Sequence, residues 1–120
     1  MEWNLDRSRP ICPQICEQLY VGIASGELAP GERLMSVREV ALAAGVNPNT
    51  VQKSFEQLEM SGAVYSVRGS GWYVSENTAA AVKKTDEMIA LKVAAFFEDM
   101  RRLGVAQSDA KKYVEEWRHE

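Results

Sequence analysis

The sequence predicts a mainly α-helical fold with one small β-hairpin, and three observations support this prediction. Apolar residues recur every three or four positions in several segments, which is typical of helices that bury one face. Between residues 63 and 74 the pattern changes to two β-rich runs around a glycine-containing turn. Helical spacing returns from residue 79 onward. We therefore expect one domain at residues 1–78 and a helical tail at residues 79–120.

The first helix is expected to begin near Cys12, with Pro13 at its first helical position, where a missing N–H group does no harm. Its apolar stripe recurs every four residues and consists of Ile11, Ile15, Leu19 and Ile23. Gly26 is placed to cap its C-terminal end. Residues 28–32 contain Pro and Gly and are predicted to form a turn.

Two further helices are predicted in close succession. Ser36 and Glu39 have the spacing of a capping box, in which each side chain accepts a hydrogen bond from the other residue's backbone N–H. Gly45 ends this second helix, while Asn47 and Pro48 suit the start of a third. The expected apolar faces are Val37, Val40, Ala41 and Ala44 in the second helix and Val51, Phe55 and Leu58 in the third. Two short helices joined by a tight glycine turn predict a helix-turn-helix.

The β-rich runs follow directly. Residues 63–67 and 71–74 are the expected strands, and the Arg-Gly-Ser sequence at 68–70 lies at the tip between them. A hairpin directly after a helix-turn-helix is a wing. Residues 1–78 therefore predict a winged helix-turn-helix.

The tail carries apolar residues at the spacing of packed helices. A first seam follows a 4-3-4-3 pattern and consists of Ile89, Val93, Phe96, Met100 and Leu103. Gly104 interrupts it, and Ser108 is expected to cap a last helix that carries Tyr113, Val114 and Trp117. Because an exposed apolar patch of this size usually marks an interface, we expect a short two-helix dimerisation tail covered by the same tail of a second copy. The alternative is a tail that folds back on its own domain.

Composition excludes several classes of protein. No apolar run reaches the roughly 18 residues of a membrane span, and the N-terminus does not resemble a signal peptide, so we expect a cytoplasmic protein. The two cysteines, Cys12 and Cys16, are expected to be small buried residues rather than a disulfide or a metal site, which would need more ligands. No nucleophile–base pair or nucleotide-binding motif is visible, so we expect no catalysis, no cofactor and no metal.

Charge does not by itself indicate a nucleic-acid partner. Residues 1–78 carry six basic and nine acidic side chains, and residues 79–120 carry eight of each. A strongly basic domain is the usual electrostatic signature of a DNA-binding protein. A DNA-binding function would therefore depend on where the positive charges lie rather than on their sum.

The sequence closely resembles the N-terminal domain of GntR-family regulators over about residues 10–75. The matching segments are GELAPGERL at 26–34, SVREVA at 36–41, GVNPNTVQK at 45–53 and YSVRGSG at 65–71. The short tail resembles the YtrA subfamily, in which it serves dimerisation. The resemblance implies a homodimer that binds an imperfect palindrome in double-stranded DNA and usually represses a nearby operon. Two residues depart from the family pattern: Met35 stands where Pro is common, and Ser70 stands where a second basic wing residue is frequent.

The candidate DNA-binding residues lie at the start of the two helix-turn-helix helices and at the wing tip. The third helix is expected to enter the major groove, where base edges present donors and acceptors, and its free N–H groups suit a phosphate. Arg38 contacts DNA by resemblance, and Arg68 can reach a minor groove from a glycine-containing tip. The full set is Ser36, Arg38, Asn47, Pro48, Asn49, Thr50, Gln52, Lys53, Arg68 and Gly69.

One alternative remains open, namely a winged-helix protein-interaction module without specific DNA binding. The net acidity favours it slightly, but the Asn-Pro-Asn-Thr start of the third helix lacks the large apolar residues of a protein-binding face. The 42 residues after position 78 are too few to enclose an ordinary ligand pocket. An unidentified small-molecule effector could still bind between the tail and the winged domain.

Overall fold

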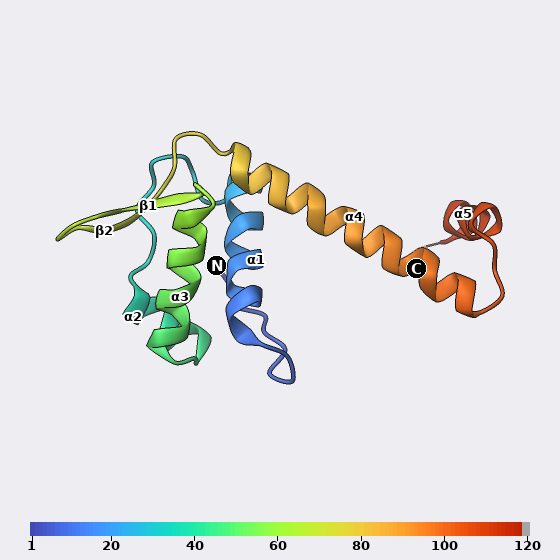
Figure 1. Cartoon of the computed structure of the whole chain (residues 1–120), viewed down its shortest axis with the longest axis horizontal. Coiled ribbons are helices and arrows are strands. Elements are labelled where there is room, and N and C mark those ends of the chain that lie inside the picture. The colour runs from blue at the N-terminus through green and yellow to red at the C-terminus, as the bar shows by residue number, and fades with distance from the viewer. Residues whose placement is uncertain (119–120) are drawn as a thin grey trace. The chain divides into compact units, whose positions relative to one another are not determined.

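The computed structural model describes residues 1–118, and its elements follow the predicted order (Figure 1). They are α1 (Ile11–Ser25), α2 (Val37–Ala44), α3 (Pro48–Met60), β1 (Val64–Val67), β2 (Gly71–Val74), α4 (Ala79–Arg102) and α5 (Gln107–Glu116). The chain divides into two compact units, Met1–Thr85 and a second unit that starts at Asp86. The first unit extends past residue 78 because Ala81, in the first turn of α4, is fully buried in its core.

The core of the first unit forms between α1 and α3, which lie side by side (Figure 1). The predicted stripe is confirmed for Ile15, Leu19 and Ile23, which are buried. α1 begins at Ile11 rather than Cys12, so Pro13 lies inside the first turn. Opposite this stripe α3 buries Val51, Phe55 and Leu58, as predicted.

The helix-turn-helix has the caps that the sequence predicts. The Ser36 Oγ accepts from the Glu39 N–H at 3.1 Å, and the Glu39 carboxylate accepts from the Ser36 N–H at 3.1 Å. Gly45 ends α2 with φ +67°, a left-handed conformation in which other residues are strained. Asn47 caps α3 by accepting from the Asn49 N–H at 2.7 Å, and Pro48 is its first residue. The short α2–α3 turn is thus fixed at both ends.

The wing is an antiparallel pair in which Val64 faces Val74 and Val67 faces Gly71. The chain before α2 extends along the free edge of β2. The Gly31 N–H donates to the Val74 carbonyl and the Val74 N–H donates to the Glu32 carbonyl, both at 2.8 Å. Trp72 packs edge-on against Phe55 with ring centroids 5.4 Å apart, so the wing base is continuous with the core.

The two cysteines face α3 from α1. The Ser54 hydroxyl lies 3.3 Å from the Cys12 Sγ, and the Cys16 thiol donates to the Ser54 carbonyl at 3.5 Å. Both are free thiols, but only Cys16 is buried, while Cys12 is half-buried. Burial, and secondly the neighbouring Cys12, raises the pKa of Cys16 to about 12, so this thiol stays protonated.

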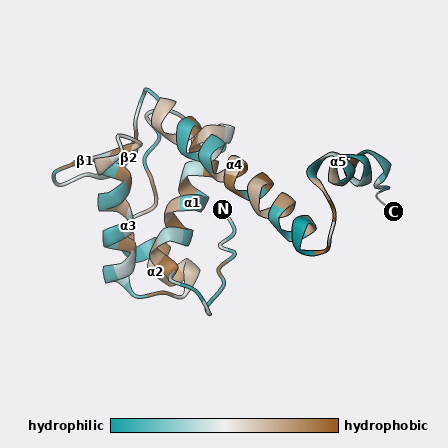
Figure 2. Ribbon diagram, turned by 45° about the vertical axis from the view of Figure 1, so that its right-hand side comes forward, coloured by the Kyte–Doolittle hydropathy of each residue, from teal (hydrophilic) through white to brown (hydrophobic). Residues whose placement is uncertain are grey.

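The second unit contains the C-terminal part of α4 and all of α5. Gly104, with φ +84°, lies two residues past the end of α4, at the point where the apolar pattern is interrupted. The prediction that Ser108 caps α5 is wrong, because α5 begins at Gln107 and its N-cap is Ala106, which makes no side-chain cap hydrogen bond. Hydrophobic and hydrophilic residues alternate around α4 (Figure 2). Within residues 1–118, no helix combines the length and the apolar character needed to cross a bilayer.

Candidate nucleic-acid interface

The start of α2 presents one positive side chain beside a satisfied cap. Arg38 is exposed in the first turn of α2. The hydrogen bonds from Ser36 hold the pKa of the Glu39 carboxyl below its usual range, and the Arg33 guanidinium adds a smaller effect. The acceptor role of Ser36 in the capping box leaves its hydroxyl proton free to be donated. An arginine and a hydroxyl at this position can contact the phosphate backbone.

The start of α3 presents neutral donors and acceptors. Asn47 uses its side-chain oxygen for the cap, which leaves its amide N–H groups for a ligand. Pro48 and Asn49 are exposed at the first two helical positions, and Thr50 is half-buried. Because Pro48 has no N–H, the free backbone donors at this helix end come from the residues after it.

Further along α3, one exposed face changes in charge from its first turns to its last. Asn49, Gln52 and Lys53 are exposed and share this face, since they are three and four residues apart. Glu56 follows on the same face and is also exposed. The acidic side chain disfavours a phosphate at that level. The face can therefore engage DNA only through its N-terminal two turns.

The wing tip is a tight turn in which the Ser70 N–H donates to the Val67 carbonyl at 2.9 Å. Arg68 and Gly69 are exposed there. A Cβ added to Gly69 would meet no atom within 4 Å, but its φ of +79° lies in the left-handed region. Glycine is therefore required here for the turn conformation, not for lack of space.

Arg33 was not predicted as a site residue, yet it lies between the wing and α2. It forms a β-bridge with Tyr73, and its Nε would be 3.4 Å from a Cβ added to Gly71. Its charge also acts on Glu39 in the first turn of α2. Arg33 belongs to the segment 26–34, one of those that resemble the GntR family. Its position beside the wing becomes visible only from the path of the chain along β2.

The exposed cations of these elements are not neutralised by internal partners. Within residues 1–118, Arg38, Lys53 and Arg68 make no hydrogen bond or ion pair, whereas Arg9 is paired with Asp6 at 3.0 Å. An unpaired guanidinium or ammonium group keeps all its donors available for phosphate oxygens. These three positive charges are thus placed where a nucleic acid could use them.

The two departures from the family pattern have local effects. Met35 is exposed just before the α2 cap, and the capping box forms without a proline there. The Ser70 hydroxyl is hydrogen-bonded to the Tyr73 hydroxyl. Ser70 therefore supports the wing internally and adds no positive charge to it.

Over most of its length the chain is similar to known transcription regulators. The model of the bacterial regulatory proteins of the gntR family matches residues 13–74. The transcriptional regulator YhcF of Bacillus subtilis is 32% identical over 91% of this chain and 90% of its own length. The transcriptional repressor YtrA of the same organism is 34% identical over 91% of this chain and 85% of its own length.

Solved structures with a similar fold include one that is bound to DNA. A GntR-family transcriptional regulator from Listeria monocytogenes superposes with a TM-score of 0.78 at 31% identity, covering 95% of this chain and all of that one. The DNA-binding domain of AraR, solved in complex with operator ORE1, superposes with a TM-score of 0.54 at 26% identity, covering 62% of this chain and 94% of that one. The family and these relatives are transcription regulators rather than enzymes. The chain belongs to the GntR family of bacterial transcriptional regulators and carries its winged-helix DNA-binding domain.

Proposed function

We propose that the protein is a sequence-specific transcriptional repressor that binds an inverted-repeat operator as a homodimer. One observation carries the proposal. Unpaired cations and amide groups are exposed at the starts of α2 and α3 and at the wing tip. The operator complex of the AraR domain supports the use of this fold on DNA.

Each element has a distinct role in the proposed complex. The exposed polar groups of Asn49, Gln52 and Lys53 on α3 read base edges in the major groove. Arg38 at the start of α2 contacts the phosphate backbone, and Arg68 reaches a minor groove from the wing tip. The remaining residues of the proposed site shape these contacts or donate to phosphates; they are Ser36, Asn47, Pro48, Thr50 and Gly69. Because each protomer offers few cations, affinity should depend less on salt than is usual for a DNA-binding protein.

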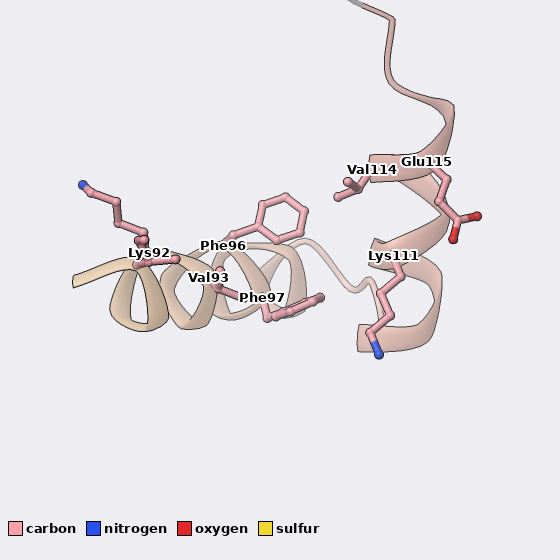
Figure 3. Close-up of a pocket in the computed structure, with 8 residues that line it drawn as sticks. Lys92, Val93, Phe96, Phe97, Lys111, Val114 and Glu115 are labelled. Carbon is pink, nitrogen blue, oxygen red and sulfur yellow. The ribbon is translucent and has the colours of Figure 1, made fainter. Parts of the chain in front are cut away.

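The second unit supplies the proposed dimer interface. An apolar hollow of about 560 Å³ lies between α4 and α5, with Phe96 and Val114 turned toward each other across it and Lys92 and Lys111 at its edges (Figure 3). Phe96 is still 36% exposed and Trp117 is 68% exposed. The other exposed apolar side chains proposed for the interface are Ile89, Val93, Leu103, Tyr113 and Val114, with Met100 half-buried.

A second copy is the simplest partner that would cover these side chains. A two-fold axis makes each tail cover the other and repeats the winged domain, so the protein would have the symmetry of an inverted repeat. A phenylalanine that becomes buried contributes roughly 1.5–3 kcal/mol, and a symmetric interface gains this contribution twice. Repression is proposed because YtrA of Bacillus subtilis, which this chain matches over most of its length, is a repressor.

The protein-interaction alternative has one observation in its favour. Leu42 of α2 is 79% exposed, four residues after Arg38 and on the same face. An apolar side chain beside the proposed phosphate contact suits a protein partner better than DNA. The experiment below decides between the two functions.

The test is selection of binding sites from a pool of randomised duplex DNA with the full chain, followed by sequencing. The proposal expects enrichment of one inverted repeat with two similar half-sites. Sedimentation of the same sample at micromolar concentration should give a dimer. A pool that gains no sequence preference over successive rounds would favour the protein-interaction alternative.

A further inference from the structure

The first ten residues form an arm that is fixed to α1 by polar contacts. The buried side chain of Gln14 is the main anchor: its Oε1 accepts from the Asp6 N–H at 2.7 Å, and its Nε2 donates to the carbonyls of Asp6 and Pro10 at 2.9 and 2.8 Å. Gln18 makes a second anchor, since it accepts from the Asn4 N–H at 3.1 Å and donates to the Glu2 carbonyl at 3.0 Å.

The bend after Asp6 is held from within the arm. The Asp6 carboxylate accepts from the backbone N–H and the hydroxyl of Ser8 and from the Arg9 Nε, at 3.0, 2.6 and 3.0 Å. The side-chain and backbone hydrogen bonds from Ser8, and then the Arg9 contact, lower the pKa of Asp6, so its carboxylate remains ionised at neutral pH. The backbone on both sides of Arg7 is therefore fixed.

From this arm Arg7 reaches the turn between α2 and α3. Its Nη2 donates to the Ala44 carbonyl at 2.6 Å, and its Nη1 donates to the Gly45 carbonyl at 3.0 Å. Carbonyls at the C-terminal end of a helix have no partner within the helix, and they are the negative end of its dipole. The planar guanidinium can hold two such carbonyls at once, which fixes direction as well as distance.

Through Arg7, the arm held on α1 is connected with the α2–α3 turn. This turn leads into α3, the helix proposed to read base edges. Asn47, the cap of α3, is two residues after Gly45. A shift of the turn would tilt the start of α3, and base contacts tolerate displacements of only a fraction of an ångström before hydrogen bonds are lost. We propose that Arg7 is a positioning residue for operator recognition: it braces the α2–α3 turn against α1 without itself touching DNA. The inference rests on the proposed DNA-binding function.

A direct phosphate contact is the competing role for Arg7, and salt dependence separates the two. A residue that neutralises a phosphate contributes about one unit to the salt slope and acts equally on all DNA sequences. A positioning residue leaves the salt slope unchanged and lowers affinity only where bases are read. The two roles therefore differ in two independent measurements.

The experiment compares Arg7→Ala and Arg7→Lys in the full chain with Lys83→Ala, which removes one positive charge from an exposed site of the same unit, outside the arm. Fluorescence anisotropy gives affinity for the selected operator and for a scrambled duplex at several salt concentrations. Circular dichroism melting confirms that each variant folds.

Arg7→Ala should lose roughly tenfold in operator affinity, the effect of a lost hydrogen bond to a charged group. On the scrambled duplex it should match Lys83→Ala, and its salt slope should equal that of the wild type. Arg7→Lys should remain at least about threefold weaker on the operator, because an ammonium group cannot reproduce the guanidinium fork.

Three results would overturn the inference: wild-type operator affinity in Arg7→Ala, an equal loss on both duplexes with a shallower slope, or full recovery in Arg7→Lys. Failure of the proposed function itself would appear differently, as a wild-type chain that does not distinguish the operator from the scrambled duplex. A variant that does not melt cooperatively is replaced by Arg7→Gln, which keeps one donor group and is judged by the same criteria.

Discussion

The Glu59 carboxylate in the last turns of α3 accepts two hydrogen bonds from Ser66 in β1, from its backbone N–H at 3.0 Å and from its hydroxyl at 2.9 Å. This contact joins α3 to the wing. Glu59 is an acidic residue near the C-terminal end of α3. It is exposed, but it also fixes the wing relative to α3.

Replacing Glu59 with Ala should therefore weaken operator binding although it removes a negative charge. Loss of both hydrogen bonds should also lower the free energy of unfolding by about 1 kcal/mol. Glu56→Ala is the matched control, since Glu56 is an exposed acid in α3 that makes no hydrogen bond within residues 1–118. Anisotropy should show weaker binding for Glu59→Ala and stronger binding for Glu56→Ala. Urea unfolding should show the lower free energy of unfolding of Glu59→Ala. If both variants bound the operator more tightly by the same factor, the contact between Glu59 and Ser66 would have no role in DNA binding.

Arg38→Ala should reduce specific affinity by roughly 1–3 kcal/mol if this side chain contacts the operator directly. The side chain is exposed and has no internal partner within residues 1–118, so the fold should not change. The measurement is operator affinity at fixed salt, with thermal unfolding as the control. Wild-type affinity in a normally folded variant would contradict the proposed docking of α2.

The capping box should make the stability of α2 depend on acid pH. The pKa of Glu39 is lowered in the folded chain, so its stabilising effect is complete above the pKa of an unfolded Glu and is lost as pH falls through the folded value. Glu39→Gln keeps an acceptor oxygen but cannot ionise. The difference in unfolding free energy between wild type and this variant should thus shrink as pH falls from about 5 to 3. Asp6 and Glu98 also have lowered pKa values, but they are common to both proteins and cancel. A difference that stays constant over this range would rule out the charged cap.

Local chemistry explains which parts of the fold were predictable. The Ser36–Glu39 box and the Asn47-Pro48 start depend on residues within one helical turn, so spacing alone located them. The Ser108 prediction failed because helix ends are uncertain by a residue or two, and a shift of one position removes a cap.

Residues whose role depends on distant contacts were not predictable. Arg7 acts on carbonyls 37 and 38 residues away. Arg33 reaches the wing only because the chain before α2 runs along β2. Neither residue has a neighbour in sequence that would reveal its partner. The exposed apolar residues of the tail differ from Arg7 and Arg33, because their proposed partner is a second copy of the chain.

Phe96→Glu should convert the proposed dimer into a monomer. A charged carboxylate would be buried twice in a symmetric interface, and burial of an unpaired charge is strongly unfavourable. The winged unit should keep its melting behaviour, because Phe96 lies beyond Thr85 in the second unit. Sedimentation at micromolar concentration is the measurement, with Leu91→Glu, at a site 71% exposed and outside the predicted seam, as the control. A dimeric Phe96→Glu would show that the subunits associate through other residues.

The most direct test of the account is an anisotropy titration of the wild-type chain against three duplexes of equal length: the selected inverted repeat, the same duplex with one half-site scrambled, and a fully scrambled duplex. Two salt concentrations separate specific from electrostatic binding. The account predicts two chains per intact repeat, with an affinity at least about 1,000-fold higher than for the fully scrambled duplex. The half-site duplex should lie between them, and the preference should persist at the higher salt. Equal affinity for all three duplexes, or binding that disappears equally from all three at the higher salt, would contradict sequence-specific recognition by a dimer.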